Sequence, residues 1–531
     1  MNLLLSEFSN SKKWKECIEN IEKNSSPILI SGLVDVSKSV LIAACQEKIN
    51  QPICLITYNE LQAKKIMKDL SLLQNQVYFF PKKEIVAYDY VAESKDGAFE
   101  RMEVLNKIEE GKVKILVTTV EAIMQEMITK EVLYQNQLHL KVGARYKLED
   151  LREKLTQMGY ERADLVENRG QFSIRGGIVD ISENENRGVR IEFWGDEVDS
   201  IRSFQISSQR STDMLQKVEI YPCYEYLLQD PIEIVVQRIR NQYSNVDEDI
   251  ELIQNGKYLS KIDKYFNCFY PQKATIFDYL GKEYCIFLDE ADKITQRAQN
   301  IQTENKNLIQ NLIEKEKFVP EAILNLASYE LKLEEDKRVK AYLQNQELVT
   351  KTRRTSQIFE TKQREIMFFK KEIEILLKDL TNAIAERKKI LVFGGKENDC
   401  KKIANLLAEN DLSYTYQRDM QKPLKAGMIT LTEGGLSSGF EDYDQNFMCI
   451  SVGEFFSDPV KRKKVSSAFK AGDKVVFADL KIGDYIVHKT HGIGIFAGIN
   501  TITTDHVTKD YIKIKYKNDD ILYVPTNQMD M

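Results

Sequence analysis

The residues most suited to chemistry stand together in the segment Gly32-Leu-Val-Asp-Val-Ser37-Lys38-Ser39. A short apolar run precedes this segment and a helical pattern follows it, which is where a phosphate-binding loop lies in nucleoside triphosphatases. The pattern of such a loop is G-x-x-x-x-G-K-[ST]. Its glycines let backbone amides surround the phosphates, its lysine reaches the outer phosphates, and its hydroxyl holds Mg²⁺. Lys38 and Ser39 match this pattern.

Two features of the segment depart from a working phosphate loop. Ser37 stands where the second glycine belongs, and its Cβ disfavours the positive φ that anion-binding loops often use. Leu33, Val34 and Val36 are also bulkier than the residues that keep such loops open. We therefore expect a degenerate loop, a strand-to-helix turn left from a nucleotide-binding ancestor. Nucleotide binding through Gly32, Lys38 and Ser39 stays open as the alternative.

A second candidate is the apolar run Cys285-Ile-Phe-Leu-Asp289-Glu290, which ends in two acids. Many nucleoside triphosphatases place a magnesium-binding acid and a water-activating base at this position of a strand. Helicase-like motors also need arginine fingers from a second lobe, and no such arginine motif follows in the sequence. We favour Asp289 as the N-cap of the next helix. A Walker-B-like role for Asp289 and Glu290 is the alternative.

Residues 171–205 alternate apolar and polar side chains between turn residues, a pattern that predicts antiparallel hairpins. Arginines are frequent in and around them: Arg169, Arg175, Arg187, Arg190, Arg202 and Arg210. Acidic residues are interleaved with these arginines, so the simplest interpretation is a solvated face with weak surface pairs. Trp194 beside Arg190, however, is typical of an interface hot spot. A solvated face and partner docking both stay open on residue types alone.

Near the end of the chain, His488 and His491 could offer two metal ligands, but no cysteine lies near them to complete a zinc site. We interpret them as polar residues at strand ends. The basic run 461–464 is either solvated or touches phosphate backbones. The positive and negative charges of residues 474–531 nearly cancel. We therefore expect this part to dock a protein, through an exposed sheet edge, rather than to bind DNA by charge.

Composition excludes several classes of protein. The 531 residues carry 75 Lys and Arg against 81 Asp and Glu, a net charge of −6, which argues against a protein that coats nucleic acid. No apolar run reaches the roughly 18 residues of a membrane span, and the N-terminus turns polar too early for a secretory signal. Eight scattered cysteines without a C-x-x-C pair disfavour a disulfide scaffold or a zinc ribbon and fit a reducing cytosol.

Around these residues the pattern predicts an α/β multidomain protein. Unbroken apolar strands at 27–31, 52–58, 77–81 and 113–120 alternate with helices at 38–49, 59–73 and 97–110, which is typical of a parallel sheet covered on both faces. Strand signals resume at 283–292. Residues 295–350 look largely helical, and a helix is expected at 364–386. Strands at 389–395, 427–432 and 447–453, with a helix at 398–409, predict a second, smaller α/β domain. The last 55 residues alternate with period two, which predicts a small β-barrel.

Three stretches resemble the transcription-repair coupling factor family, Mfd. Residues 170–212 resemble the segment that this family shares with the excision-repair protein UvrB and that docks UvrA. Residues 79–105 resemble a conserved segment of the family, with Ala87 in place of its usual proline. Residues 483–528 resemble the RNA-polymerase-interacting domain shared with CarD-type regulators. The order of these motifs along one chain points to the N-terminal half of such a factor.

The resemblance implies a division into domains. A UvrB-like domain 1a, degenerate and RecA-like, is expected at 1–139, a UvrA-binding insertion at 140–225, and a UvrB-like domain 1b at 226–350. The small α/β domain follows at 355–457, a linker at 458–473, and the polymerase-interacting barrel, CarD- and Tudor-like, at 474–531. The resemblance also implies that the first domain has no ATPase activity, which agrees with Ser37. Residues 81–101 are too few to hold the DNA-clamping hairpin of UvrB.

The resemblance also implies partners and site residues. Arg175, Arg190 and Trp194 fall where the family contacts UvrA, and Ile502 falls at an apolar position that the family uses against the RNA polymerase β subunit. The family continues into an ATP- and Mg²⁺-dependent DNA translocase and a masking domain. This chain stops at Met531, so we expect a truncated form without the motor. We expect a monomeric, cytoplasmic bacterial adaptor that needs no cofactor and meets DNA weakly or through its partners. The alternatives are an active nucleoside triphosphatase and a CarD-like transcription regulator.

Overall fold

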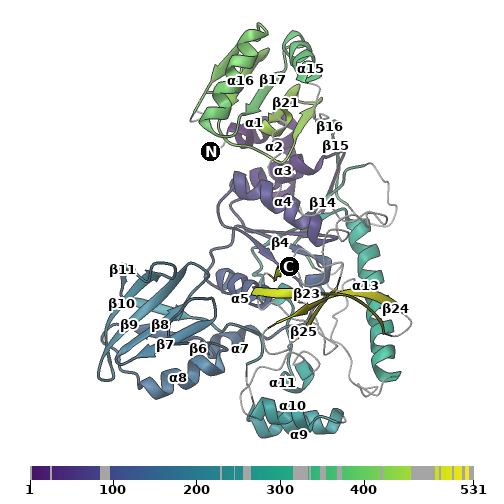
Figure 1. Cartoon of the computed structure of the whole chain (residues 1–531). Coiled ribbons are helices and arrows are strands. Elements are labelled where there is room, and N and C mark those ends of the chain that lie inside the picture. Colours follow the sequence, from purple (N-terminus) through teal and green to yellow (C-terminus); the bar gives the residue numbers. More distant parts are fainter. Residues whose placement is uncertain are drawn as a thin grey trace. The chain divides into compact units, whose positions relative to one another are not determined.

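The computed structural model describes residues 3–23, 27–83, 96–227, 230–243, 245–254, 265–314, 333, 336–346, 355–366, 373–418, 422–455, 485–488, 492–504, 507–516 and 521–525. Residues 1–455 form one compact unit and residues 456–531 form a second. The larger unit holds two α/β sheets and an antiparallel module, and the smaller one holds a single antiparallel sheet (Figure 1). The expected multidomain α/β architecture is therefore confirmed.

The first sheet has seven strands in the order β15-β1-β14-β13-β2-β4-β3, and every neighbouring pair is parallel. Its strands are β1 (Ile28–Ser31), β2 (Ile53–Thr57), β3 (Val77–Phe80), β4 (Ile115–Thr119), β13 (Cys285–Asp289), β14 (Val339–Leu343) and β15 (Ile358–Glu360). In β2, β4 and β13 every residue is buried. Helices on both faces exclude water, which is why these strands read as continuous apolar runs.

Helices and connecting segments cover this sheet. The helices of this part of the chain are α1 (Leu3–Asn10), α2 (Lys12–Lys23), α3 (Asp35–Ile49), α4 (Glu60–Leu73), α5 (Asp96–Glu109), α6 (Val120–Ile123), α7 (Lys130–Gln135), α9 (Ile232–Gln242), α10 (Asp247–Gln254), α11 (Phe266–Phe269), α12 (Ile276–Tyr279) and α13 (Ala291–Glu314), of which α4, α5, α6 and α13 contact strands of the sheet. The three helices expected before residue 120 are α3, α4 and α5. The expectation that residues 295–350 are largely helical is wrong at β14, an interior strand, third from the β15 edge, whose side chains alternate between buried and half-buried.

The antiparallel module lies between β4 and β13 in the sequence. Its sheet has the order β11-β10-β9-β8-β7-β6, in which only β6 and β7 are parallel. The strands are β6 (Glu161–Arg162), β7 (Gln171–Arg175), β8 (Ile178–Ser182), β9 (Arg187–Trp194), β10 (Glu197–Gln205) and β11 (Ser211–Leu215). β5 (Leu138–Lys141) pairs with β12 (Lys217–Ile220), and α8 (Leu148–Gln157) packs its leucines into the core of the module. The predicted hairpins are confirmed.

The second α/β sheet has six strands in the order β16-β20-β21-β17-β19-β18. They are β16 (Gln363–Ile366), β17 (Lys389–Phe393), β18 (Tyr414–Tyr416), β19 (Met428–Thr432), β20 (Gly439–Asp442) and β21 (Phe447–Ser451), accompanied by α15 (Ile373–Ala385), α16 (Glu397–Glu409) and α17 (Val452–Phe455). The helix expected at 364–386 begins too early, because residues 363–366 form β16 and pair with β20.

One hydrophobic core joins the two α/β sheets. Phe8 of α1 stacks on Trp14 of α2, with ring centroids 5.3 Å apart, and meets Phe440 of β20 edge-on at 6.1 Å. The same buried cluster contains residues of β1, β2 and α3 from the first sheet and of β17 and β21 from the second. The N-terminal helices α1 and α2 therefore pack between the two sheets.

The smaller unit contains β22 (Tyr485–His488), β23 (Gly492–Thr504), β24 (Val507–Lys515) and β25 (Ile521–Pro525), paired antiparallel in this order. The period-two pattern predicted these strands, while closure into a barrel stays a prediction. The linker at 458–473, the basic run 461–464, His491 and Ala87 lie outside the described residues. Among the described residues, none of the helices is both long and apolar enough to cross a membrane.

Candidate functional site

The degenerate phosphate loop connects β1 to α3, and its lysine points into the protein. Lys38 is fully buried, and its Nζ donates hydrogen bonds to Asp289 Oδ1 at 2.5 Å and Glu290 Oε1 at 2.8 Å. Burial opposes a charge on Lys38, but the two carboxylates outweigh this effect and raise its pKa, so the ammonium stays charged. The sequence motifs thus do come together. The Lys38 ammonium and the carboxylates of Asp289 and Glu290 compensate each other's charges, as buried charged groups must.

The expected N-cap role of Asp289 is wrong. Asp289 is the last residue of β13, and Glu290 stands between it and Ala291, where α13 begins. The second oxygen of Asp289 accepts from Gln62 Nε2 at 3.3 Å. Ser39, which would hold magnesium in a working loop, is fully buried, and its hydroxyl is within 3.5 Å of the Ile66 carbonyl in α4. These two residues therefore serve the packing of α3 and α4 against the sheet.

Backbone amides of the loop are also committed to protein acceptors. The Leu33 amide donates to the Gln344 carbonyl at 3.2 Å, and the Val34 amide donates to Gln363 Oε1 at 3.3 Å. Gly32 has a φ of +82°, and a Cβ at this position would lie 1.8 Å from the Thr361 carbonyl oxygen. Since the lysine and these amides are bonded to protein acceptors, the residues as arranged here do not fit a nucleotide.

A second site lies on the polar face of the antiparallel module, where one aspartate organises two arginines. Asp180 of β8 is fully buried. Its Oδ1 accepts from Arg190 Nε at 2.7 Å, and its Oδ2 accepts from an Arg190 terminal nitrogen at 2.9 Å and an Arg175 one at 2.6 Å. The Arg190 guanidinium also lies over the Phe204 ring, 5.0 Å from its centroid. The bidentate pairing fixes the plane of Arg190, and Arg175 remains about half exposed.

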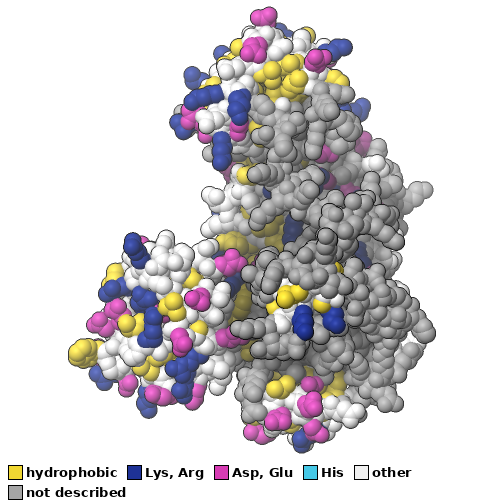
Figure 2. Space-filling view, viewed as in Figure 1, with side chains coloured by type: hydrophobic (Ala, Val, Ile, Leu, Met, Phe, Trp, Pro, Cys, Tyr) yellow, Lys and Arg dark blue, Asp and Glu magenta, His cyan; other side chains and the backbone are white. Residues whose placement is uncertain are grey.

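Trp194 lies on the same face of the module. Along β9, Val189, Ile191 and Phe193 point into the core, so Arg190 and Trp194 point to the opposite side by the period of a strand. Trp194 ends the strand before the turn at Gly195 and is 85% exposed, a large apolar ring held in solvent. Figure 2 shows basic, acidic and hydrophobic side chains interspersed over this module.

The structure adds residues that the sequence did not single out for this face. Met214 of β11, 64% exposed, pairs with Arg202 of β10, and Arg202 pairs in turn with Arg190. In the sequence, Asp180 is one of several acidic residues interleaved with the arginines, and nothing distinguishes it from the others. Its role depends on the register that sets it beside Arg190, which residue types alone do not give. We call Arg175, Arg190, Trp194, Arg202 and Met214 the arginine–tryptophan face.

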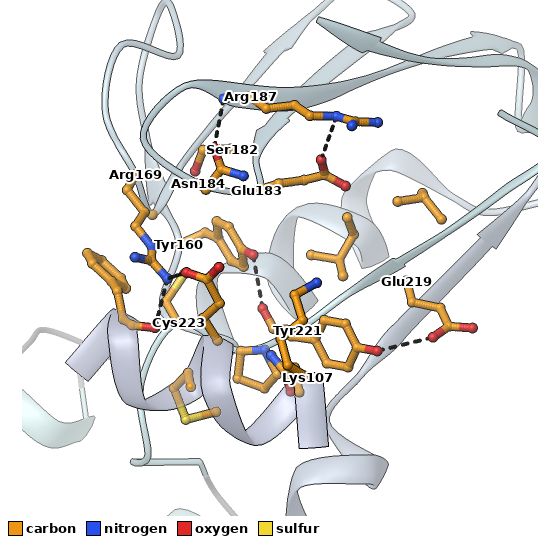
Figure 3. A pocket seen from close by; sticks show the side chains of 18 of the residues that line it. Lys107, Tyr160, Arg169, Ser182, Glu183, Asn184, Arg187, Glu219, Tyr221 and Cys223 are labelled. Atoms are coloured by element: carbon orange, nitrogen blue, oxygen red, sulfur yellow. Dashed lines mark hydrogen bonds and ion pairs between the residues drawn. The ribbon is translucent and has the colours of Figure 1, made fainter. Parts of the chain in front are cut away.

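A cleft of about 640 Å³ separates this module from α5 (Figure 3). Arg169 donates to the Phe99 carbonyl at 2.8 Å and to Glu103 at 2.9 Å, and Arg187 pairs with Glu183 at 3.2 Å. Tyr160 donates to the Tyr221 carbonyl at 2.9 Å. Both arginines therefore already have acidic partners. The contacts of Arg169 tie the module to α5.

The remaining candidate, Ile502, lies in β23 opposite Lys509 of β24. His488 ends β22, opposite Gly492. Their side chains are outside what the structure describes, so the apolar contact predicted for Ile502 stays a prediction.

Two sequence families match parts of the chain. The family described as "UvrB interaction domain" matches residues 138–226, which include the arginine–tryptophan face. The family described as "CarD-like/TRCF RID domain" matches residues 480–531, the part that contains the four-stranded sheet of the smaller unit.

Relatives with curated names match nearly the whole chain. The "Transcription-repair-coupling factor" of Bacillus subtilis (strain 168) is 30% identical over 98% of this chain and 46% of its own length. The protein of the same name from Staphylococcus haemolyticus (strain JCSC1435) is 28% identical over 100% of this chain and 47% of its own. The chain thus spans about half the length of these relatives. The resemblance is confirmed: this chain is a relative of the transcription-repair-coupling factors, matched from end to end by slightly less than half of such a protein.

Proposed function

We propose that this chain is an adaptor of transcription-coupled nucleotide excision repair in the bacterial cytoplasm, with one surface for UvrA and another for RNA polymerase. The observation that carries this proposal is the arginine–tryptophan face. Two arginines held by the buried Asp180, beside an 85% exposed tryptophan, are the residue types that dominate protein interfaces. The match of residues 138–226 to a UvrB interaction domain supports UvrA as the partner.

The binding experiment compares variants of the arginine–tryptophan face with a matched change elsewhere on the module. Arg175→Ala combined with Arg190→Glu removes one cation and reverses another, and we expect UvrA affinity to fall at least about a hundredfold, roughly 2.7 kcal/mol. Arg152→Ala, on the exposed side of α8, should leave affinity unchanged. Equal affinity of the two variants for UvrA would contradict the proposed face.

For the smaller unit we propose docking to the β subunit of RNA polymerase, through the strand that contains Ile502. The match of residues 480–531 to a CarD-like domain supports this assignment. Ile502→Lys should abolish capture of the purified polymerase while leaving UvrA binding intact. A CarD-like regulator without a repair role is the rival, and it would bind polymerase but show no measurable affinity for UvrA.

We further propose that Lys38, Ser39, Asp289 and Glu290 do not hydrolyse nucleotides in this chain. The buried ion cluster and the committed loop amides support this view, since both would have to be broken before a phosphate could enter. The alternative, an active nucleoside triphosphatase, predicts ATP hydrolysis that disappears in Lys38→Ala. Hydrolysis with this property by the purified chain would defeat the proposal.

A further inference from the structure

Gln363 is the first residue of β16 in the second α/β sheet, yet its side chain reaches the degenerate phosphate loop of the first. Its Oε1 accepts from the Val34 amide at 3.3 Å and also contacts the Ser37 hydroxyl. Its Nε2 donates to Asp442 Oδ2 of β20 at 2.9 Å. One half-buried side chain therefore joins the two sheets, and we call these contacts the Gln363 bridge.

The chemistry at both ends of the bridge requires an amide. The Val34 amide is only a donor, so the atom facing it must be an acceptor. Asp442 is fully buried and already accepts from Gln445 through its backbone amide at 3.1 Å and its side chain at 2.9 Å, so the third atom facing it must be a donor. A glutamate would lack the donor, and a lysine or arginine would lack the acceptor. Asparagine would be one methylene shorter.

The backbone around Gln363 reinforces this contact. The Thr361 amide donates to the Ser31 carbonyl at 2.9 Å, and the Thr361 carbonyl lies against Gly32. Ser37, which departs from the glycine of a working phosphate loop, supplies the hydroxyl that meets Gln363. Serine in place of glycine at position 37 thus both disfavours nucleotide binding and contributes a contact to the Gln363 bridge.

We propose that the former phosphate loop is now a structural joint, in which Gln363 anchors the second α/β domain to the loop between β1 and α3. The Val34 amide of this loop binds Gln363 in place of a phosphate. The second domain is therefore held in a fixed position on the first, and any opening of the loop requires release of Gln363 from Val34.

An exchange of groups across the bridge tests the proposal. Gln363→Glu places a carboxylate against the buried Asp442, and we expect the midpoint of urea unfolding to fall. Adding Asp442→Asn restores a donor, Asn Nδ2, that faces the new carboxylate, and should recover at least half of the loss. Gln299→Glu, the same change on the exposed side of α13, is the control and should leave the midpoint unchanged. A double variant no more stable than Gln363→Glu alone would overturn the proposal.

A second measurement separates a joint between domains from ordinary support within the second sheet. In Gln363→Ala, hydrogen–deuterium exchange should accelerate about tenfold in a peptide covering residues 32–39, since roughly 1.4 kcal/mol of local stability is lost. Peptides from β17 and β19 should exchange as in the unchanged protein. Unchanged protection of residues 32–39 would contradict the proposal, whatever happens in β17 and β19.

Discussion

At the scale of single residues, Asp180 decides how the arginine–tryptophan face is presented. Because its carboxylate holds Arg190 in two places and Arg175 in one, it acts on a partner only through them. Asp180→Asn keeps the shape but removes the charge, so we expect UvrA affinity to fall about tenfold, roughly 1.4 kcal/mol. Titration calorimetry measures this change. A larger loss in Asp180→Asn than in the double arginine variant would contradict an indirect role.

The buried ion cluster of Lys38 leads to a prediction about stability. Lys38→Met leaves Asp289 and Glu290 buried without their common cation, and we expect the free energy of unfolding to fall by about 3–5 kcal/mol. Adding Asp289→Asn should return part of this loss. Lys64→Met, whose side chain is 63% exposed in a surface pair with Glu60, should change the stability by less than about 0.5 kcal/mol. Urea unfolding of the three variants makes the comparison.

Glu441 gives a prediction that depends on pH. Burial raises the pKa of Glu441, but Lys388 at 2.5 Å and Arg364 at 2.8 Å outweigh it and hold the pKa below its ordinary value of 4.5. The stabilisation is therefore present above pH 4.5 and is lost as the pH falls through the lowered pKa. Glu441→Gln should cost about 2–3 kcal/mol at pH 7 and pH 5, and less at pH 4. An unfolding penalty that is equal at all three pH values would contradict this account.

At the scale of elements, the turn between β1 and α3 depends on a residue without a side chain. Gly32→Ala would bring a Cβ within 1.8 Å of the Thr361 carbonyl at a φ of +82°, so we expect at least about 2 kcal/mol of destabilisation. Gly97→Ala in α5 is the matched control. Its Cβ meets nothing within 4 Å, and alanine is the better helix former, so stability should rise by about 0.5–1 kcal/mol. Thermal unfolding should show a lower midpoint for Gly32→Ala and a higher one for Gly97→Ala.

The elements also show what residue patterns can and cannot reveal. The unbroken apolar runs of β1, β2 and β4 favoured strands over buried helix segments because they are only four or five residues long. The helix expected at 364–386 begins too early because apolar residues from Ile366 to Ile384 recur at helical spacing, although Ile366 is buried in the strand β16. The spacing of apolar residues along the chain does not show whether a buried residue belongs to a helix or to a neighbouring strand.

The candidate sites were predictable to different depths. Residue types alone left partner docking open, and the family resemblance pointed to Arg175, Arg190 and Trp194, which do lie on one face of the module. The partners of Lys38 lie about 250 positions away, and Gln363 lies more than 320 positions from Val34, so neither contact has a local signature. The Lys38 contact depends on the strand order within one sheet, and the Gln363 contact depends on how the two sheets pack against each other.

At the scale of the whole molecule, the two compact units separate the proposed tasks. A chain ending at Phe455 retains every described residue of the larger unit, so we expect it to fold and to bind UvrA with unchanged affinity. It should lose all capture of RNA polymerase. Surface-bound partners and the purified shortened chain suffice for this test. Retained polymerase binding would place that surface within residues 1–455.

The cysteines report on the larger unit as a whole. All eight are buried and outside disulfides, and burial raises the pKa of Cys54 to about 12 and that of Cys268 to about 11. The native protein at pH 8 should therefore react with a thiol reagent at well under one equivalent within minutes. All eight thiols should react after denaturation in urea. Rapid reaction of several thiols in the native protein would mean that the unit opens far more easily than its packing implies.

The chain has only two tryptophans, and the fold places them in opposite surroundings: Trp14 is fully buried against Phe8, while Trp194 projects into solvent. Intrinsic fluorescence therefore carries two separable signals. Acrylamide quenches the red-shifted emission of Trp194 and spares the blue-shifted emission of Trp14. An encounter at the arginine–tryptophan face can thus be followed spectroscopically without attaching a dye, while the second indole monitors whether the N-terminal helices remain packed.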